Sequence, residues 1–164
     1  MKKIISSLLV CGSILNATNF DSGMKMLNAG AEQEAKEAFC LSAKSGDIDS
    51  QMILGEMYLD GIGVDVDHQK AFFWLSKAAR GGDAEAQYLL GFMYENGLKV
   101  AVNIKRAAKW YTEAALQGDI LSQYNLAIIY KEGKGEVEKD MKKAFRWIAM
   151  VQDARENLDH VASK

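Results

Sequence analysis

Few side chains in this sequence have the types and spacing that catalysis requires. Ser22 and Lys25 form an S-x-x-K pair, the arrangement of a serine nucleophile and a lysine in one class of acyl-transfer enzymes. The S-D-N and K-T-G motifs that support such a serine are missing from the sequence, and in a chain this rich in lysine an S-x-x-K match arises by chance. We therefore expect no catalytic role for Ser22.

The cysteines give no stronger indication of catalysis. Cys40 lies among apolar residues, which is typical of a small buried side chain. A nucleophilic thiolate needs a base nearby, and the two histidines, His68 and His160, are far away in the sequence. We predict no catalytic residue in this chain.

Two loop patterns suggest ligand binding at first sight. Asp65, Asp67 and His68 form a small acidic loop that could hold a cation, but Asp67 also stands where a helix needs an N-cap. The glycine pairs at residues 61–63 and 133–135 are similar to phosphate loops, but they follow no predicted strand and recur within a repeat. We interpret both as solvated turns and expect neither a metal nor a cofactor.

The strongest pattern is an internal repeat with a step of 36 residues. So many identities in register are not expected by chance. In the third copy the second half is displaced by one residue, so its loop holds one extra residue. The recurring positions include Gly46, Gly82 and Gly118; Gln51, Gln87 and Gln123; Leu54, Leu90 and Leu126; Tyr58, Tyr94 and Tyr130; Gly61, Gly97 and Gly133; and Trp74, Trp110 and Trp147.

Each copy predicts two helices. Apolar residues recur at helical spacing in both halves, and Gly97 stands where a left-handed C-cap is needed. Asp67, Asn103 and Asp140 each precede the second helix as N-caps. The predicted fold class is all-α, an α/α solenoid of about three and a half 36-residue helix-turn-helix repeats. The predicted units are about 20–45, 46–81, 82–117 and 118–153, with a polar C-terminal cap to 164, inside a repeat domain of 18–164.

Small and large residues at fixed phases predict how the helices pack. Gly55 and Gly91 stand within helices, where glycine costs about 0.5–1 kcal/mol relative to alanine, so close approach of a neighbouring helix is expected there. The tryptophans share a phase with the alanine stripe and are predicted to be core residues, with a cost of about 3–5 kcal/mol for Trp110→Ala. Lys99 replaces a loop glycine found at 63 and 135, so this turn is expected to be built differently.

These residues resemble a known family. The pattern Ala-x-Gln-x-x-Leu-Gly-x-Met-Tyr-x-x-Gly, followed by Lys/Arg-Ala-x-x-Trp-x-x-x-Ala-Ala-x-x-Gly, resembles the Sel-one-like repeat, a relative of the tetratricopeptide repeat. The resemblance implies a helical-repeat scaffold. Some cysteine-rich members of this family are classed as penicillin-binding proteins or β-lactamases, and in them cysteine pairs eight residues apart connect adjacent helices. The matching positions here are Ala43 with Gln51, Ala79 with Gln87, and Ala115 with Gln123, and none is cysteine.

The resemblance also implies where a partner would bind. In the related tetratricopeptide fold, the first helices of the hairpins line a groove, and the matching positions here vary between copies. Mixed apolar and charged side chains suit a protein or peptide partner; Phe92 and Ile128 could instead pack inside the fold. The predicted binding residues are Met52, Glu56, Glu85, Tyr88, Phe92, Glu95, Tyr124, Ile128 and Lys131, with Asp49, Leu59 and Leu121 on the same stripes.

The N-terminus has the layout of a secretory signal peptide. A basic start is followed by an apolar stretch from Ile4 to Leu15, which is too short to span a bilayer, and then by small residues near Ala17. We expect residues 1–17 to be removed and the mature chain to reach the periplasm or the extracellular space without stable membrane insertion. The alternatives are a buried first helix and a lipid anchor at Cys11.

Composition limits the partners. The net charge of −2 gives no basis for nucleic-acid binding, and the hydrophobic fraction of 49% fits a folded domain. The sequence therefore predicts an exported scaffold that binds a protein or peptide. The alternatives are a β-lactamase-like or penicillin-binding hydrolase, suggested only by the family, and a structural subunit of an envelope complex.

Overall fold

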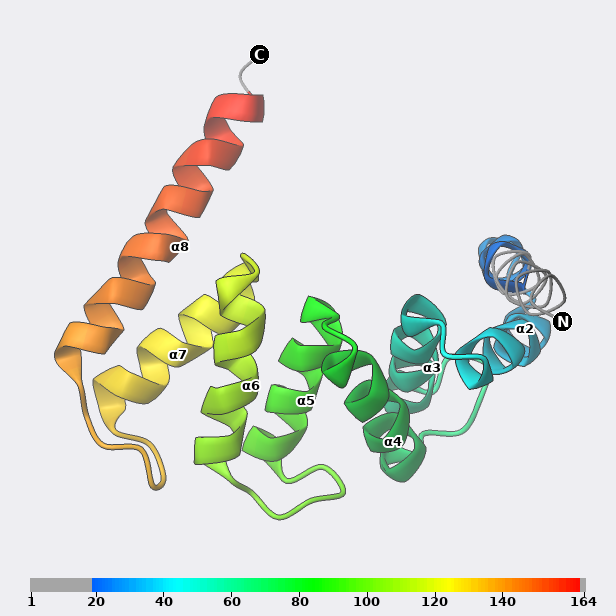
Figure 1. Cartoon of the computed structure of the whole chain (residues 1–164), viewed down its shortest axis with the longest axis horizontal. Coiled ribbons are helices and arrows are strands. Elements are labelled where there is room, and N and C mark those ends of the chain that lie inside the picture. Colours follow the sequence, from blue (N-terminus) through cyan, green and yellow to red (C-terminus); the bar gives the residue numbers. More distant parts are fainter. Residues whose placement is uncertain (1–18, 163–164) are drawn as a thin grey trace, which may run out of the picture. The chain divides into compact units, whose positions relative to one another are not determined.

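The computed structural model describes the backbone of residues 19–162 and the side chains through residue 156. The predicted signal peptide, residues 1–17, lies outside this range, as do Cys11 and the side chain of His160. The described part of the chain is helical and contains no strand, which confirms the predicted all-α fold class (Figure 1).

The helices follow one another in hairpins. A helical segment at residues 19–28 precedes them. Six helices have 13 residues each, whereas the last has 22. In order they are α2 (Glu32–Lys44), α3 (Ile48–Asp60), α4 (His68–Arg80), α5 (Ala84–Asn96), α6 (Ile104–Leu116), α7 (Ile120–Glu132) and α8 (Met141–Ala162).

The chain divides into two compact units, Met1–Asp83 and Ala84–Lys164. In the first unit, α3 packs on α4 and on the preceding helix α2. In the second unit, α5 packs on α6, α6 on α7, and α7 on α8. Each repeat thus has a first helix (α3, α5, α7) and a second helix (α4, α6, α8), and first helices pack most extensively on the second helix that follows.

The predicted caps set the ends of the helices. Asp67 Oδ1 accepts hydrogen bonds from the backbone N–H groups of Gln69 and Lys70, both at 3.0 Å. Asn103 caps α6 through the backbone N–H of Arg106, and Asp140 caps α8 in the same way. The first helices end in the left-handed conformation at Gly61, Gly97 and Gly133, with φ of 78°, 70° and 71°. These predictions are confirmed.

One turn differs from the prediction. Lys99 adopts φ of 70°, close to the 63° of Gly63 and the 60° of Gly135. This position therefore has the same left-handed φ in all three turns, and a lysine carries the strain that glycine avoids. The expectation of a differently built turn was wrong because the repeat geometry, and not the local residue, decides this conformation.

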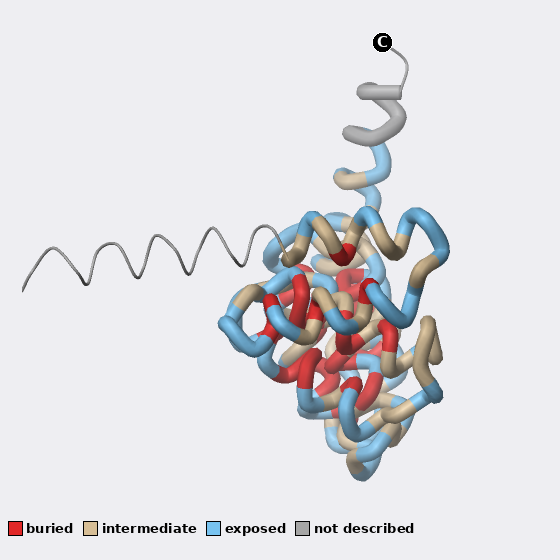
Figure 2. The backbone as a smooth tube through the Cα atoms, turned by 90° about the vertical axis from the view of Figure 1, so that its right-hand side faces the viewer, coloured by how far each residue is buried: buried red, intermediate tan, exposed pale blue. Residues whose placement is uncertain are grey.

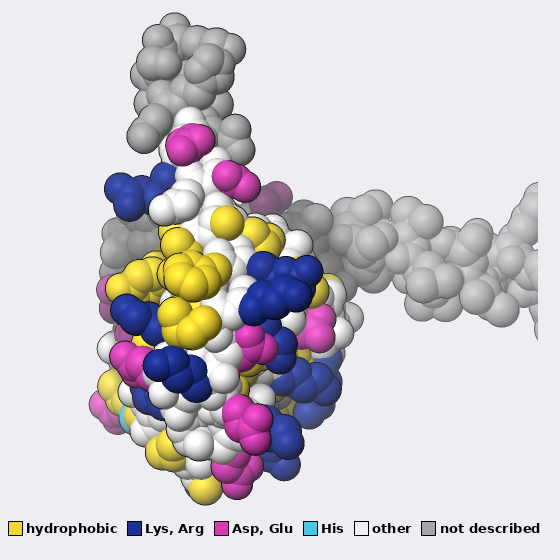
Figure 3. Space-filling view, turned by 90° about the vertical axis from the view of Figure 1, so that its left-hand side faces the viewer, with side chains coloured by type: hydrophobic (Ala, Val, Ile, Leu, Met, Phe, Trp, Pro, Cys, Tyr) yellow, Lys and Arg dark blue, Asp and Glu magenta, His cyan; other side chains and the backbone are white. Residues whose placement is uncertain are grey.

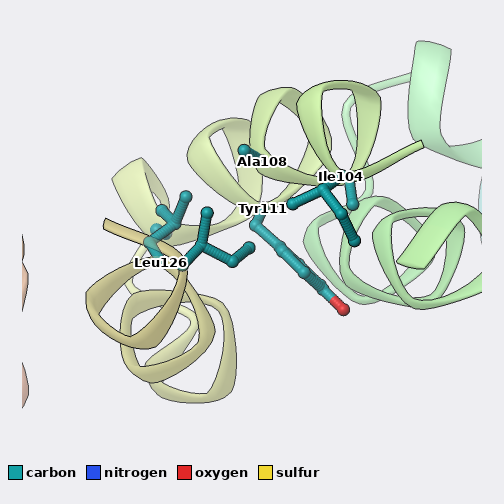
Figure 4. Packing of buried hydrophobic residues seen from close by; sticks show 7 residues of the cluster. Ile104, Ala108, Tyr111 and Leu126 are labelled. Atoms are coloured by element: carbon teal, nitrogen blue, oxygen red, sulfur yellow. The ribbon is translucent and has the colours of Figure 1, made fainter. Parts of the chain in front are cut away.

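Each unit has its own hydrophobic core. In the first unit, Phe39, Leu54 and Met57 are fully buried between α2, α3 and α4. In the second unit, Tyr111 of α6 is fully buried with Leu126 of α7, and its ring extends from α6 with the hydroxyl toward α5 (Figure 4). Buried positions alternate with exposed ones along the helices (Figure 2), as expected for helices that each bury one stripe.

The helix glycines mark close contacts, as predicted. A Cβ at Gly55 would lie 2.5 Å from Cγ of Leu75, and a Cβ at Gly91 would lie 2.7 Å from the Tyr111 ring. The neighbour is in both cases the second helix of the same hairpin. Close packing of that helix therefore offsets the cost of glycine within a helix.

The predicted tryptophan core holds only in the first unit. Trp74 is 8% exposed, whereas Trp110 and Trp147 are only partly buried. The next residue of the second helix, Tyr111, points toward the first helix and is 0% exposed. The assignment of Trp110 to the core was wrong, because Phe73 and Lys77, which lie against the Trp74 ring, have the exposed Lys109 and Glu113 as their counterparts on α6.

Within each unit, a buried glutamine joins one hairpin to the helix before it. Gln51 Nε2 donates to the carbonyl of Ala43 at 3.0 Å, and Gln123 Nε2 donates to the carbonyl of Ala115 at 3.1 Å. Both bonds are buried, and they connect the positions that carry cysteine pairs in the cysteine-rich members of the family implied by the sequence. A buried side-chain hydrogen bond therefore connects these neighbouring helices.

Candidate functional site

The predicted binding stripe of the second unit lies on α5 and α7. Glu85, Phe92 and Lys131 are exposed, Phe92 at 36%, and Tyr124 is 56% exposed. On α7, Leu121 lies one turn before Tyr124 and is equally exposed at 56%. The stripe therefore offers aromatic and aliphatic side chains next to charges of both signs.

Two residues of this stripe have partners within the fold. Tyr88 packs against Tyr111, with ring centroids 5.9 Å apart, and Ile128 is half-buried on α7. Glu95 has a side chain only 18% exposed. The accessible part of the stripe therefore consists mainly of Glu85, Phe92, Tyr124 and Lys131, and Tyr88 and Ile128 contribute partial surfaces.

In the first unit the stripe lies on α3. Met52, Glu56 and Leu59 are half-buried, and Asp49 is exposed. This helix offers less aromatic surface than α5 and α7, because a methionine stands where Tyr88 and Tyr124 stand in the later copies. The larger exposed apolar surface is in the second unit.

Glu95 is the centre of a polar network in the second unit. Its carboxylate accepts a hydrogen bond from the Tyr111 hydroxyl at 2.7 Å and pairs with Lys134 Nζ at 2.7 Å. Neither Leu59 nor Lys131, which hold the same register on α3 and α7, could accept these bonds. The network connects the C-terminal end of α5 to the loop that follows α7.

Burial sets the protonation state of the tyrosines near this network. Burial raises the pKa of Tyr111 well above its usual value, and the hydrogen bond that it donates to Glu95 raises the pKa further. The pKa of Tyr88 is also raised, first by burial and then by the negative charges of Asp119 and Glu95. Both phenols therefore stay neutral at neutral pH, and the Tyr111 hydroxyl acts as a hydrogen-bond donor and not as a base.

The candidate catalytic and metal-binding residues do not gather. Ser22 and Lys25 lie one turn apart on the helical segment 19–28. Cys40 is a half-buried free thiol against the core of the first unit. Asp67 caps α4 and pairs with Lys70 at 3.1 Å, and these bonds lower the pKa of Asp67. Within the part of the chain that the structure describes, no three His, Cys, Asp or Glu side chains converge on a metal site.

Sequence reasoning missed a groove between the second helices of the second unit. Two adjoining cavities of about 410 and 520 Å³ lie along α6 and α8, and Thr112, Tyr130 and Lys143 line both. The larger cavity is apolar and is lined by Trp147, with Met150 beside it. The smaller one is bordered by charged side chains of α6 and of the loop between α7 and α8. The tryptophan period was the available signal, but it was assigned to the core.

The matching region of the first unit has a different surface. Phe73 packs edge-on against Trp74 at 4.9 Å, and Lys77 Nζ lies 5.2 Å above the Trp74 ring. Arg146 and Met150 take these two positions on α8, where Trp147 stays partly exposed. The apolar cavity is thus a property of the second unit and not of the repeat.

Hydrophobic side chains are also exposed on α8 itself. Phe145 is 62% exposed, and Met141 and Met150 are each 39% exposed. The face that carries α8 shows hydrophobic side chains between groups of Lys and Arg side chains (Figure 3). None of the described helices is both long and apolar enough to serve as a membrane span.

The fold and these surfaces define an all-helical repeat protein with open grooves. A Sel1 repeat model matches residues 48–83, 84–119 and 120–150. The chain belongs to the Sel1 repeat family, which confirms the resemblance found in the sequence. Among curated proteins none matches the chain in sequence.

Solved structures agree with this assignment. A protective antigen of uropathogenic Escherichia coli strains with an SLR fold is 30% identical with a TM-score of 0.79, over 89% of this chain and 33% of that one. A Sel1 repeat protein from Oxalobacter formigenes is 28% identical with a TM-score of 0.77, over 82% and 55% of the two chains. Helicobacter pylori cysteine-rich protein B is 25% identical with a TM-score of 0.56, over 73% and 90%. The chain therefore spans about a third and about half of the length of the first two.

Proposed function

We propose that this chain is an exported scaffold that binds a protein or peptide through the exposed stripe of α5 and α7. The observation that carries the proposal is the exposure of Phe92, Tyr124 and Leu121 on successive first helices. Large aromatic side chains at such positions are typical anchors of protein interfaces, and helix grooves of this kind take extended or helical peptides.

The repeat pattern supports this assignment. Residues that the fold needs, such as the buried glutamines and leucines, are the same in all three copies, whereas the stripe positions differ. Phe92 has Glu56 and Ile128 as its counterparts, and Lys131 has Leu59 and Glu95. Positions that stacking leaves unconstrained are available for selecting a partner.

The proposed site of action is the periplasm or the extracellular space. The support is the basic start and short apolar stretch of residues 1–17 in the sequence. Expression of the full chain in a Gram-negative host, followed by mass spectrometry of the N-terminus in the periplasmic and culture fractions, tests this. An intact N-terminus retained in the cytoplasm would contradict export.

Site-specific photo-crosslinking tests the binding surface. A photoreactive phenylalanine analogue at Phe92 or Tyr124 is expected to capture one defined partner in the native host, and Tyr124→Ala should weaken capture without loss of helicity. The control is the same analogue at Glu113, an exposed position of the second helix α6. Equal capture from both faces, or none from Phe92 and Tyr124, would contradict the proposal.

A further inference from the structure

We propose that the groove between α6 and α8 is a second binding site, which takes an acidic peptide carrying one bulky apolar side chain. This site is on the second helices and is separate from the stripe of α5 and α7. Its two adjoining cavities, of about 410 and 520 Å³, share the lining residues Thr112, Tyr130 and Lys143. They therefore form one continuous groove with an apolar part and a charged part.

The apolar part provides a pocket for one large side chain. Trp147, Met150 and Ala149 line it, and Thr112 turns its hydroxyl back to the carbonyl of Ala108 at 2.7 Å. The hydroxyl of Thr112 is thus already satisfied within its own helix. A partly exposed tryptophan and a flexible methionine beside a cavity of this size suit an aromatic or leucine side chain.

The charged part has an excess of cations. Lys105, Lys109, Lys139 and Arg146 border the two cavities and make no ion pair with another described residue. The fifth cation, Lys143, pairs with Asp140 at 3.5 Å and lies over the Tyr130 ring at 4.9 Å. Only Glu136 and Glu138 add further negative charge. Unpaired cations along a groove favour a partner with carboxylates.

The repeat does not require this chemistry. The corresponding groove of the first unit has Gln33 at the position of Lys105, and its helix α2 carries Glu37 at the position of Lys109. Because α2 forms the same kind of helix with Gln33 and Glu37 at these positions, the repeat does not need the cations of α6. The combination of an open apolar pocket with free cations is therefore a specific feature of the second unit.

The dimensions set the spacing within the peptide. Lys105 and Thr112 are seven residues apart on α6, about 10 Å at a rise of 1.5 Å per residue. An extended peptide covers this distance in about three residues. The apolar side chain and the acidic residues are therefore adjacent in the sequence of the partner, with the acidic residues starting one or two positions away.

A synthetic peptide tests the site directly. The probe is the acetylated, amidated pentapeptide Phe-Ser-Asp-Glu-Asp, titrated into ¹⁵N-labelled full chain. The indole N–H signal of Trp147, assigned with Trp147→Phe, is expected to shift saturably with a Kd below about 1 mM. Trp74 is the internal control, because it has the same register in the first unit but is covered by Phe73. Its signal should not move.

Matched peptides and variants decide the outcome. Phe-Ser-Lys-Arg-Lys and Gly-Ser-Asp-Glu-Asp should each bind at least about tenfold more weakly. The double variant Lys105→Gln, Lys109→Glu gives α6 the residues that α2 has at these positions. Met150→Glu gives α8 the residue that α6 has at Glu113. Both variants therefore use residues that another helix of the repeat already carries. Each is expected to lower the affinity about tenfold or more, whereas Lys131→Glu on the stripe of α7 should leave it unchanged.

Several results would overturn the proposal. These are no saturable shift at Trp147, equal affinity for the cationic peptide, or a loss of affinity with Lys131→Glu alone. The last result would place peptide binding on the stripe of the first helices. It would support the proposed function and exclude the groove as the binding site of this peptide. A saturable shift at Trp147 together with failed crosslinking at Phe92 and Tyr124 would support the groove and contradict binding at the stripe.

Discussion

At the scale of single residues, Lys99 keeps a left-handed backbone conformation that glycine provides at the same position of the other two hairpins. Its φ of 70° costs a residue with a side chain about 1–2 kcal/mol. Replacement by glycine removes this cost, but the greater freedom of glycine in the unfolded chain offsets about 0.4–1 kcal/mol of the gain. We expect Lys99→Gly to stabilise the chain by about 0.5–1 kcal/mol in urea unfolding. Lys99→Ala keeps the Cβ and should bring no comparable gain, so equal effects of the two variants would exclude strain as the cause.

Two buried serines are a second feature at this scale. The hydroxyls of Ser50 and Ser122 are fully buried without a hydrogen-bond partner among the described residues, and Ala86 holds their position in the second copy. A buried hydroxyl without a partner costs free energy, so Ser50→Ala and Ser122→Ala should be neutral or stabilising by up to about 1 kcal/mol. Thermal unfolding measures this. The reverse change, Ala86→Ser, should destabilise, and a clear loss of stability in the two alanine variants would mean that the hydroxyls have partners in solution.

At the scale of elements, the packing of α6 assigns different roles to two adjacent aromatic residues. Tyr111 is 0% exposed and donates to Glu95, whereas Trp110 is partly exposed. Tyr111→Ala should cost about 3–5 kcal/mol, as the removal of a buried aromatic side chain does. Trp110→Ala should cost about 1–2 kcal/mol, since less apolar surface is lost.

Chemical denaturation of both variants measures this difference. Tyr111→Phe serves as a control, because it keeps the ring and removes only the hydrogen bond, at about 1–2 kcal/mol. An equal loss in the free energy of unfolding for Trp110→Ala and Tyr111→Ala would show that Trp110 is a core residue after all.

The elements themselves could be predicted from the sequence, whereas their surfaces could only be predicted in part. Caps such as Asp67 and Gly97 act locally, and the three copies repeat the same signals, so the hairpins followed directly. The tryptophan period did not distinguish the buried Trp74 from Trp147, which lines a cavity, because both recur with the same step. The cavity beside Trp147 depends on the absence of a covering residue, which is visible only in three dimensions.

The candidate binding stripe illustrates the same limit. The register of Phe92 and Tyr124 followed from the repeat, and both side chains are exposed. Glu95 has the same register, but its carboxylate is engaged with Tyr111 and Lys134. The sequence predicts the helix face on which Glu95 lies, but it does not reveal that Tyr111 and Lys134, from two other elements, bind its carboxylate.

At the scale of the whole molecule, the chain consists of two compact units that use the same device to hold successive hairpins. The buried bond from Gln51 to Ala43 lies in the first unit, and that from Gln123 to Ala115 lies in the second. A repeat protein derives its stability from the interfaces between neighbouring elements. Each glutamine therefore acts at one interface within one unit.

Replacing one of these bonds with a disulfide tests this view of the molecule. In a background with Cys11→Ser and Cys40→Ser, the pair Ala115→Cys, Gln123→Cys should oxidise readily, as the cysteine pairs of the family's cysteine-rich members imply. Closing a loop of about nine residues stabilises by about 2–3 kcal/mol, and losing the buried hydrogen bond costs about 1 kcal/mol, so a net gain of about 1–2 kcal/mol is expected. Because the bond lies within the second unit, amide hydrogen exchange should slow in α6 and α7, while α3 changes little.

The pair Ala43→Cys, Gln51→Cys should give the opposite distribution, and the reduced forms provide the baseline. Uniform protection from either bond would show that the two units unfold as one, and a loss of stability on oxidation would show that these helix ends are not placed as the glutamine bonds indicate.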